Sequence, residues 1–502
     1  MLSPPTQILK SEKGATANEQ NRATPGTIVY CIDMSSSMNR TYKMPASQAA
    51  WQTVKTSGDQ KYVSKLTRLD CIKKAVTRLI EQLKLEKPEQ KVLLAVFASD
   101  VTVKAGGANH MTPSFDNLEH QTMAELLDKG LNSASSYPLV PIEESYESIV
   151  AAVKALIARE GNGKRSTALG PALSLCVGFL RKVPNSQVVL CTDGLPNVGI
   201  GSLNDIIRIS RNMFERGADF YRQIGTYACN KNITINILAV DGPSVEMRSI
   251  SEAATLTGGT TNKINPAEIV RELRIIAQKE VVANSVSVTF YLHPNFVFDE
   301  PDFGDNLSRL EKEVGSVKKE TDMTFRFKLK DPSKAEDIDS VPFQIQIIYT
   351  RNDGMKCMRV LSKRAGATRN RATMEQYVNV AVVGVAAMRT TANLAKVGKG
   401  KEAQEYMKLV KRLVKRGSNT SEQLEERLAF EAQAESWDKE LTDNNEVYCT
   451  SHLTDLSSKM VQQAMSSNMI QHLAMGKKID VVTNRKMNAA AKKAYYNYTY
   501  DL

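Results

Sequence analysis

Four short, almost wholly apolar runs recur along the first half of the chain, and each ends in a polar turn. The runs are TIVYCID (27–33), KVLLAVFA (91–98), QVVLCTD (187–193) and ITINILAVD (233–241). Such runs are typical of strands that are buried on both faces of a parallel sheet. Between and after them, apolar residues recur at helical spacing over 69–83, 144–158, 168–180, 203–229, 246–256 and 266–280. Because strands that alternate with helices build this architecture, the sequence predicts a doubly wound, parallel α/β domain over residues 27–281.

The pattern changes after residue 281, where apolar residues begin to alternate with polar ones. This period of two occurs over 286–292, 325–329 and 343–349. Alternation indicates strands with one buried and one exposed face, as in antiparallel sheets. We therefore expect a small antiparallel β-sandwich over 282–362. A basic stretch, SKRAGATRNR (362–371), follows it. A solvated interdomain linker is the simpler interpretation of this stretch, and contact with an anionic surface is the alternative.

The remaining part of the chain has the pattern of an α-helical bundle, predicted over 373–475. Thr373-Met-Glu-Gln376 has the form of a capping box and precedes an apolar helical run through Met388. Further helices are expected at 400–416, 420–441 and 451–474. The polar ends of the chain, 1–26 and 476–502, are predicted to be a disordered tail and a loosely held polar tail.

Composition and cysteine usage favour an intracellular globular protein of about three domains. The chain has 502 residues, of which 42% are hydrophobic and 24% charged, so wholesale disorder is excluded. Three of the 7 cysteines, Cys31, Cys176 and Cys191, lie in apolar runs, and no two cysteines have C-x-x-C spacing. We therefore expect reduced, buried thiols and a cytoplasmic protein without a signal peptide. The net charge of +11 permits an anionic partner without requiring one.

Three loops combine hydroxyl and carboxylate side chains next to predicted strands or helices. Asp33-Met-Ser35-Ser-Ser37 follows the first strand, Ser166-Thr167 precedes the helix at 168–180, and Thr192-Asp193-Gly194 follows the third strand. In a doubly wound sheet, ligands bind at the carboxyl ends of the strands. We therefore expect the three loops to converge at one edge of the sheet.

Two carboxylates and three hydroxyls form a donor set that suits Mg²⁺ (or Mn²⁺), because hard cations prefer oxygen ligands. The candidate metal-site residues are Asp33, Ser35, Ser37, Thr167 and Asp193. With few protein charges on the metal, a carboxylate from a protein partner could fill an open coordination position. The alternative interpretation is a Ser-rich turn that only caps a helix.

These residues resemble the metal-ion-dependent adhesion site of von Willebrand factor A domains. The shared pattern is Asp-x-Ser-x-Ser, then a Thr, then Thr-Asp-Gly, and every element of it is present. The resemblance covers about residues 27–281. It implies that Asp33, Ser35, Ser37, Thr167 and Asp193 hold the metal, directly or through water.

A second resemblance extends over more of the chain. The segment 220–264, with Phe220-Tyr221, Glu246-Met247 and Leu256-Thr-Gly-Gly259, is similar to the end of the trunk domain of Sec23 and Sec24, the inner-coat subunits of COPII vesicles. The order of α/β domain, β-sandwich and helical domain matches that architecture. The paired C-x-x-C of the coat subunits' zinc ribbon is missing from this sequence, and its metal-site pattern is intact where theirs is generally degenerate.

One predicted helix, 401–416, is basic and amphipathic. Its cations could contact an anionic membrane surface, or they could form the solvated face of a bundle helix. Leu409, Val410, Leu413 and Val414 are expected to share its apolar face. Nucleic acid is not expected as a partner. The cations are Lys408, Lys411, Arg412, Lys415 and Arg416.

Three hypotheses about function follow. The first is a non-enzymatic binding module or scaffold that recognises an acidic residue of a protein partner through the metal. The second is a membrane-associated coat or trafficking scaffold of the Sec23/Sec24 type. The third is a substrate-recruiting subunit of an enzyme complex. The five histidines have no ligand spacing and the chain has no phosphate-binding G-x-x-x-x-G-K-[ST] loop, so no catalytic activity of its own is predicted.

Overall fold

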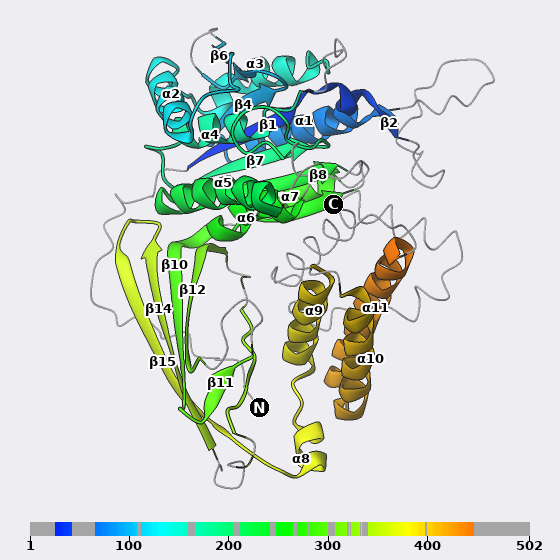
Figure 1. Ribbon diagram of the computed structural model, residues 1–502. Coiled ribbons are helices and arrows are strands. Elements are labelled where there is room, and N and C mark those ends of the chain that lie inside the picture. The colour runs from blue at the N-terminus through cyan, green and yellow to red at the C-terminus, as the bar shows by residue number, and fades with distance from the viewer. Residues whose placement is uncertain are drawn as a thin grey trace, which may run out of the picture.

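The computed structural model describes residues 26–445, except for 43–65, 108–111, 159–165, 204–210, 241–246, 265–268, 279–280, 300–306, 319–320, 322, 332, 334–339 and 397–398. Three predicted segments lie outside the described residues: the helix at 451–474, the C-terminal tail at 476–502 and all but the last residue of the tail at 1–26. Figure 1 shows an α/β domain at one end of the molecule, with a long antiparallel sheet and a group of helices side by side below it.

The α/β domain is built on a seven-stranded sheet with the order β6-β5-β4-β1-β7-β8-β9. The four predicted strands are confirmed as β1 (Thr27–Asp33), β4 (Lys91–Phe97), β7 (Ser186–Thr192) and β8 (Ile233–Val240). They pair in parallel, and β9 (Thr261–Ile264) extends the parallel part. The sequence did not predict the antiparallel edge formed by β5 (Val101–Ala105) and β6 (Ser114–Phe115).

Helices cover both faces of this sheet, as a doubly wound domain requires. One core contains side chains from α2 (Met123–Ser136), α4 (Leu169–Phe179), α5 (Arg211–Asn230) and α6 (Met247–Thr257). The other contains side chains from α1 (Arg68–Glu86), α3 (Ile142–Lys154) and α7 (Ile269–Gln278).

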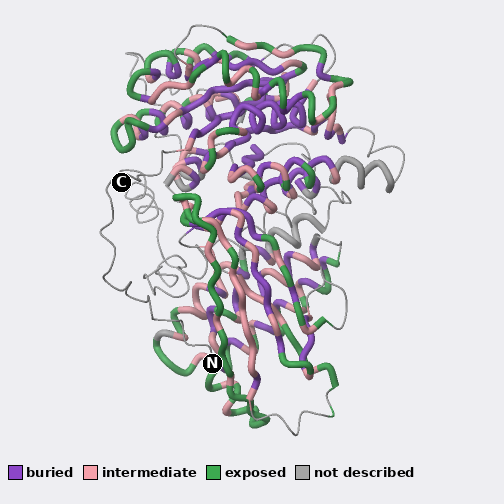
Figure 2. Tube along the Cα trace, turned by 90° about the vertical axis from the view of Figure 1, so that its left-hand side faces the viewer, coloured by how far each residue is buried: buried purple, intermediate pink, exposed green. Residues whose placement is uncertain are grey.

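Strand β1 explains why the sheet sequences lack alternation. Val29 and Cys31 lie in the first core, whereas Ile28, Tyr30 and Ile32 lie in the second. Successive side chains of a strand point to opposite faces, so both faces of β1 must be apolar. All seven residues of β1 are buried, and Figure 2 shows the buried, purple segments gathered in the interior of the α/β domain.

The second unit contains two antiparallel sheets, as predicted. The larger has the order β12-β10-β14-β15, and the smaller pairs β11 with β13. Phe290 of β10 contacts the smaller sheet, because its ring centroid lies 5.6 Å from that of Phe298 on β11. Within its own sheet it stacks on Phe343 of β14, also with 5.6 Å between the ring centroids. The strands are β10 (Val281–Leu292), β11 (Phe296–Phe298), β12 (Arg309–Lys318), β13 (Phe327–Leu329), β14 (Ser340–Arg351) and β15 (Lys356–Gly366).

The predicted linker at 362–371 is partly wrong, because β15 continues to Gly366 and pairs with β14 along its length. The sandwich therefore extends past the predicted boundary at residue 362. Lys363 pairs with Phe343, and Arg359 pairs with Ile347. Paired residues point to the same face, so these cations lie on the side of the core yet stay exposed at the sheet edge. An edge strand tolerates charges that a central strand would exclude.

The helical unit consists of α8 (Arg371–Gln376), α9 (Val380–Lys396), α10 (Gly400–Gly417) and α11 (Ser421–Asn445). The predicted capping box at Thr373 is wrong. The cap is Asn370, whose side chain accepts a hydrogen bond from the Thr373 backbone N–H at 3.1 Å. A second cap follows, since Asn379 accepts from the Val382 N–H at 3.0 Å, so the chain forms two helices where one was expected.

The α/β domain meets the sandwich through two glycines. Gly258, just after α6, has φ +70°, and Gly315 of β12 has φ +78°. A Cβ on Gly258 would lie 1.8 Å from the Ser316 carbonyl oxygen, and one on Gly315 would lie 2.4 Å from the Leu256 carbonyl oxygen. No other residue fits where two backbones approach so closely.

The sandwich meets the helical unit through arginines. Arg326 donates hydrogen bonds to Thr390 of α9 at 2.9 Å and to the carboxylate of Asp299 at 2.8 Å. Arg389 of α9 donates to the carbonyl of Thr324.

The glycine contact predicts that Gly258→Ala lowers the free energy of unfolding by about 3 kcal/mol, from left-handed strain and overpacking together. Gly354→Ala is a matched control, because Gly354 has φ +85° but nothing within 4 Å of its would-be Cβ. The control should lose only about 1 kcal/mol. Urea unfolding of both variants measures the difference, and equal losses would contradict the role of the contact.

Candidate functional site

The first part of the site is the turn that follows β1. Asp33 ends the strand, and its Oδ1 accepts a hydrogen bond from the Ser35 backbone N–H at 2.8 Å. A short 3-10 helix, η1 (Ser36–Asn39), begins there, and its Met38 is fully buried in the core. The Asp-x-Ser-x-Ser segment is thus a tight turn that is held at both ends.

The end of β7 supplies the second carboxylate. Strands β1 and β7 are neighbours, and Ile32 pairs with Cys191, so both strands end at the same level. The Thr192 hydroxyl donates to Asp33 Oδ2 at 2.6 Å, and the Ser37 hydroxyl donates to Asp193 Oδ1 at 2.6 Å. The hydroxyl oxygens of Ser35 and Ser37 are 2.9 Å apart. The two loops therefore form one hydrogen-bonded network.

Thr167 lies beside this network, on the loop before α4. Its backbone N–H donates to Asn197 Oδ1 at 2.7 Å, and the Asn197 N–H donates to the Thr167 carbonyl at 3.1 Å. A Cβ on Gly194 would lie 3.3 Å from Thr167 Oγ1 and 3.7 Å from both Asp33 Oδ2 and Ser37 Oγ. These oxygens therefore surround Gly194. The structure brings together all five residues that the sequence singled out, here called the Asp33 cluster: Asp33, Ser35, Ser37, Thr167 and Asp193.

The Asp33 cluster carries two carboxylates in a position that solvent does not reach. Asp33 and Asp193 are both 0% exposed. Burial, and next the charge of Asp193, raise the pKa of Asp33 to about 6, although hydrogen bonds from Thr192 and Ser35 oppose the shift. The cluster is therefore short of positive charge.

Sequence reasoning missed one residue of the site, Arg68. Its Nη1 lies 2.5 Å from Asp193 Oδ2, and its side chain is only 12% exposed. Arg68 is the first residue of α1, directly after the N-cap Thr67, which forms a capping box with Asp70. The available signal was Thr67-x-x-Asp70, which has the form of a capping box and marks the start of a helix at Arg68. A helix that follows β1 in a doubly wound domain begins near the carboxyl end of that strand, where the site lies.

The predicted basic helix is α10 of the helical unit, which lies apart from strands β1 and β7 in Figure 1. α10 packs through Met407, Val410 and Val414, whereas Leu409 is 61% exposed and does not share their face. Two of its cations are paired: Arg416 with Glu375 at 2.8 Å and Lys411 with Asp438 at 4.0 Å. Three others are exposed: Lys408, Arg412 and Lys415.

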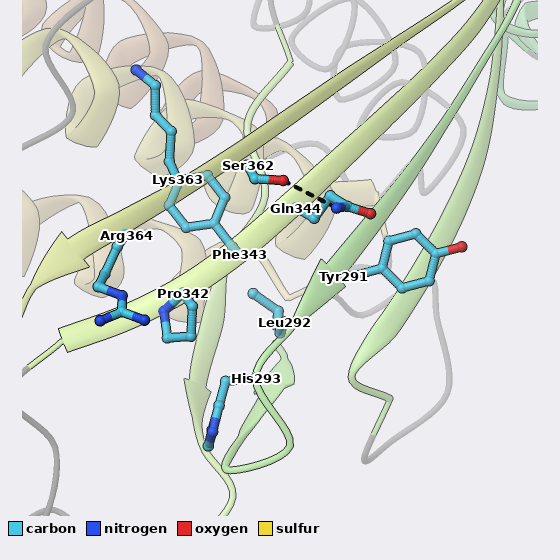
Figure 3. A pocket seen from close by; sticks show the side chains of 9 residues that line it. All are labelled: Tyr291, Leu292, His293, Pro342, Phe343, Gln344, Ser362, Lys363 and Arg364. Carbon is cyan, nitrogen blue, oxygen red and sulfur yellow. Dashed lines mark hydrogen bonds between the residues drawn. The ribbon is translucent and has the colours of Figure 1, made fainter.

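A shallow hollow of about 520 Å³ lies on the larger sheet of the sandwich, over the ends of β10, β14 and β15. Figure 3 shows the Ser362 hydroxyl and the Gln344 amide hydrogen-bonded across two strands, with Tyr291 on the neighbouring strand. The hollow is open to solvent, whereas the two carboxylates of the Asp33 cluster are buried.

Other expectations concern metals, thiols and membrane spans. Cys31, Cys176 and Cys191 are buried and free, as predicted. Among the residues that the structure describes, no three His, Cys, Asp or Glu side chains are grouped to hold a metal, so the Asp33 cluster depends on its hydroxyls for further ligands. Within the same described ranges, no helix is both long and apolar enough to cross a bilayer.

The sheet order, the helices on both faces and the Asp-x-Ser-x-Ser turn at the carboxyl edge define a von Willebrand A-like α/β domain. Within this class, residues 62–268 match the Sec23/Sec24 trunk domain family. The chain is thus Sec23/Sec24 trunk-like over this segment, and an antiparallel sandwich and a helical unit follow its α/β domain.

Two relatives share sequence with the chain. It is 28% identical to Circularly permutated Ras protein 1 of Dictyostelium discoideum, over 98% of this chain and 57% of that protein. It is 34% identical over 107 residues to Protein transport protein SEC24-2 of Naumovozyma castellii, which is 20% of this chain and 12% of that protein. The chain therefore spans only part of the length of each relative.

The crystal structure of the human COPII-coat protein Sec24c has the same fold, with a TM-score of 0.54 at 13% identity. The match covers 90% of this chain and 59% of that chain. Coverage of 90% means that the likeness in fold includes units beyond the α/β domain.

The raised pKa predicts how the stability of the metal-free protein depends on pH. A carboxyl group with a pKa of 3.8 unfolded and about 6 folded stabilises the protein fully below pH 3.8, and this contribution is lost as the pH rises through about 6. With a chelator present, the free energy of unfolding of the wild type relative to Asp33→Asn should fall by about 3 kcal/mol between about pH 4 and about pH 7. Urea titrations across this range measure it.

The control for this experiment is Asp219→Asn, because the Asp219 side chain is 50% exposed on α5. This variant should follow the pH dependence of the wild type. The raised pKa of Asp33 would be contradicted if the free energy of unfolding of the wild type, relative to Asp33→Asn, stayed constant or rose between about pH 4 and about pH 7.

Proposed function

We propose that this chain is a non-enzymatic scaffold whose Asp33 cluster binds a divalent cation, Mg²⁺ or Mn²⁺, and through it an acidic residue of a protein partner. The observation that carries the proposal is the convergence of two buried carboxylates and three hydroxyls. Asp33, Ser37 and Thr167 place oxygens within 3.7 Å of the position of a Cβ on Gly194, and the Ser37 hydroxyl hydrogen-bonds with Ser35 and Asp193. The cytoplasm is the proposed compartment, since the free, buried cysteines suit a reducing environment.

The chemistry of the donor set fits such a cation. Asp33 Oδ2, Ser37 Oγ and Thr167 Oγ1 face a common position, and every donor is a hard oxygen. Burial, and next the charge of Asp193, raise the pKa of Asp33, although Arg68 pairs with Asp193, so one guanidinium does not fully offset two buried carboxylates. A bound divalent cation would supply the missing positive charge and would polarise a carboxylate from the partner.

Hydroxyl donors leave much of the cation's charge uncompensated. Only Asp33 and Asp193 contribute formal charge among the five residues of the Asp33 cluster. A site of this kind favours an anionic ligand in its open position, which supports an acidic residue as the recognised group.

The metal proposal predicts that Mg²⁺ stabilises the protein against unfolding, because a ligand of the folded state alone must do so. The gain should be about 2.7 kcal/mol when Mg²⁺ is present at about 100 times its Kd. Thermal unfolding with Mg²⁺ titrated against EDTA measures it. Asp33→Ala should abolish the gain, whereas Asp219→Ala, which removes an exposed carboxylate from α5, should retain it.

Partner capture is the companion measurement. A protein partner retained by the wild type should be lost on chelation and in Asp33→Ala. If the partner is still retained after chelation and by Asp33→Ala, recognition through the metal is contradicted, even if Mg²⁺ stabilises the chain.

A second candidate function is a coat or trafficking scaffold that associates with membranes. It is favoured by the match of residues 62–268 to the Sec23/Sec24 trunk domain and by the common fold with Sec24c. The exposed cations of α10, Lys408, Arg412 and Lys415, are the proposed contacts with anionic lipid.

This second candidate predicts co-sedimentation with phosphatidylserine vesicles that weakens as salt is added. Replacing Lys408, Arg412 and Lys415 by Gln should reduce vesicle affinity about a hundredfold, at about 1 kcal/mol for each cation. The control replaces three exposed cations of the α/β domain, Lys74, Arg78 and Lys129. Equal losses in both variants would indicate a general charge effect.

A further inference from the structure

The hydrogen bonds of the Asp33 cluster use all four carboxylate oxygens. Asp33 accepts from the Ser35 N–H on Oδ1 and from the Thr192 hydroxyl on Oδ2. Asp193 accepts from the Ser37 hydroxyl on Oδ1 and from the Arg68 guanidinium on Oδ2. Three of these donors are neutral, and Arg68 brings a full positive charge.

Two structural features hold Arg68 in this position. The capping box of α1 places it at the first helical residue: the Thr67 hydroxyl accepts from the Asp70 N–H at 3.0 Å, and the Thr67 N–H donates to Asp70 at 3.1 Å. The Arg68 N–H donates to the carbonyl of Arg40 at 3.1 Å, just beyond η1.

The strand pair next to it adds to this connection. β2 (Thr41–Tyr42) pairs with β3 (Leu66–Thr67), so the chain that leaves the serine turn is bonded to the start of α1. Arg68 is therefore part of the same local structure as Ser35 and Ser37, and it does not reach the cluster as an unrestrained surface side chain.

The charges decide what this arrangement does. Asp33 and Asp193 carry two negative charges when ionised, and Arg68 neutralises one of them at 2.5 Å. A divalent cation bound to the same carboxylates would meet the positive guanidinium inside a buried site, where screening by water is weak. The guanidinium and the metal thus neutralise the same charge.

We propose that Arg68 is a built-in competitor of the divalent cation: it holds Asp193 when the metal is absent and lowers the affinity of the Asp33 cluster for it. This inference rests on the proposed metal function. It adds a regulatory element, because any partner contact that draws Arg68 away from Asp193 would tighten metal binding.

The test is isothermal titration of MgCl₂ alone into the wild type, Arg68→Gln and Arg68→Lys. Removal of the guanidinium should tighten Mg²⁺ binding at least tenfold in Arg68→Gln, because a neutral amide no longer repels the metal. Arg68→Lys keeps the charge, so its Kd should stay within a few-fold of the wild type.

Arg78→Gln is the matched control. Arg78 is exposed on the same helix, ten residues and so about 15 Å further along, and its loss changes net charge equally. It should leave the Kd for Mg²⁺ unchanged. A gain in this control equal to that of Arg68→Gln would overturn the proposal, since net charge alone would then explain it.

The outcomes separate this inference from the function on which it rests. Equal Mg²⁺ affinity in wild type and Arg68→Gln, or weaker binding in Arg68→Gln, overturns the competition and leaves the metal site standing. Absence of Mg²⁺ binding in both proteins overturns the metal function and the competition together. If Arg68→Gln unfolds in EDTA, millimolar Mg²⁺ should restore its folding, and a variant that stays unfolded with Mg²⁺ contradicts the proposal.

Discussion

The parallel pairing of β1 with β7 is the interaction on which the rest of the site depends. It aligns Ile28–Ile32 with Gln187–Cys191, so that Asp33, which ends β1, and Asp193, which follows β7, lie at the same edge. Two buried carboxyl groups then lie in one site, and burial, with the charge of Asp193, raises the pKa of Asp33. Serine and threonine hydroxyls stabilise them only in part, because they are neutral. A cation can supply the remainder, and among the described residues Arg68 pairs with Asp193.

Much of the α/β fold could be predicted because its strands are buried on both faces. Runs such as residues 27–33 and 233–241 are almost wholly apolar, which is typical of strands buried on both faces of a parallel sheet. The edge of the sheet could not be predicted so well. β6 is only two residues long, and its pairing depends on neighbours that are distant in the sequence. The local sequence of the basic end of β15 resembles a linker. Its strand conformation comes from pairing with β14, which lies earlier in the chain.

The site shows the same division between local and tertiary information. Asp33, Ser35 and Ser37 belong to one turn, and Asp193 follows a recognisable strand, so the sequence indicates their meeting. Arg68 reaches Asp193 across 125 positions of sequence. Nothing in its immediate neighbourhood except a helix cap distinguishes it from other arginines. The cap at α8 was misplaced for a related reason: Asn370 and Thr373 both precede helical sequence, and side-chain geometry decides between them.

Edge strand β15 has a consequence for how copies of this protein behave at high concentration. An exposed edge of eleven residues offers backbone hydrogen bonds to any other strand and invites aggregation. Arg359 and Lys363 place positive charges on the core side of that edge, opposite Ile347 and Phe343. A second copy that paired there would bring its own Arg359 and Lys363 against them and bury the charges of both chains. Arg359, and Lys363 from the predicted linker, therefore oppose the extension of the sandwich into a sheet of many molecules.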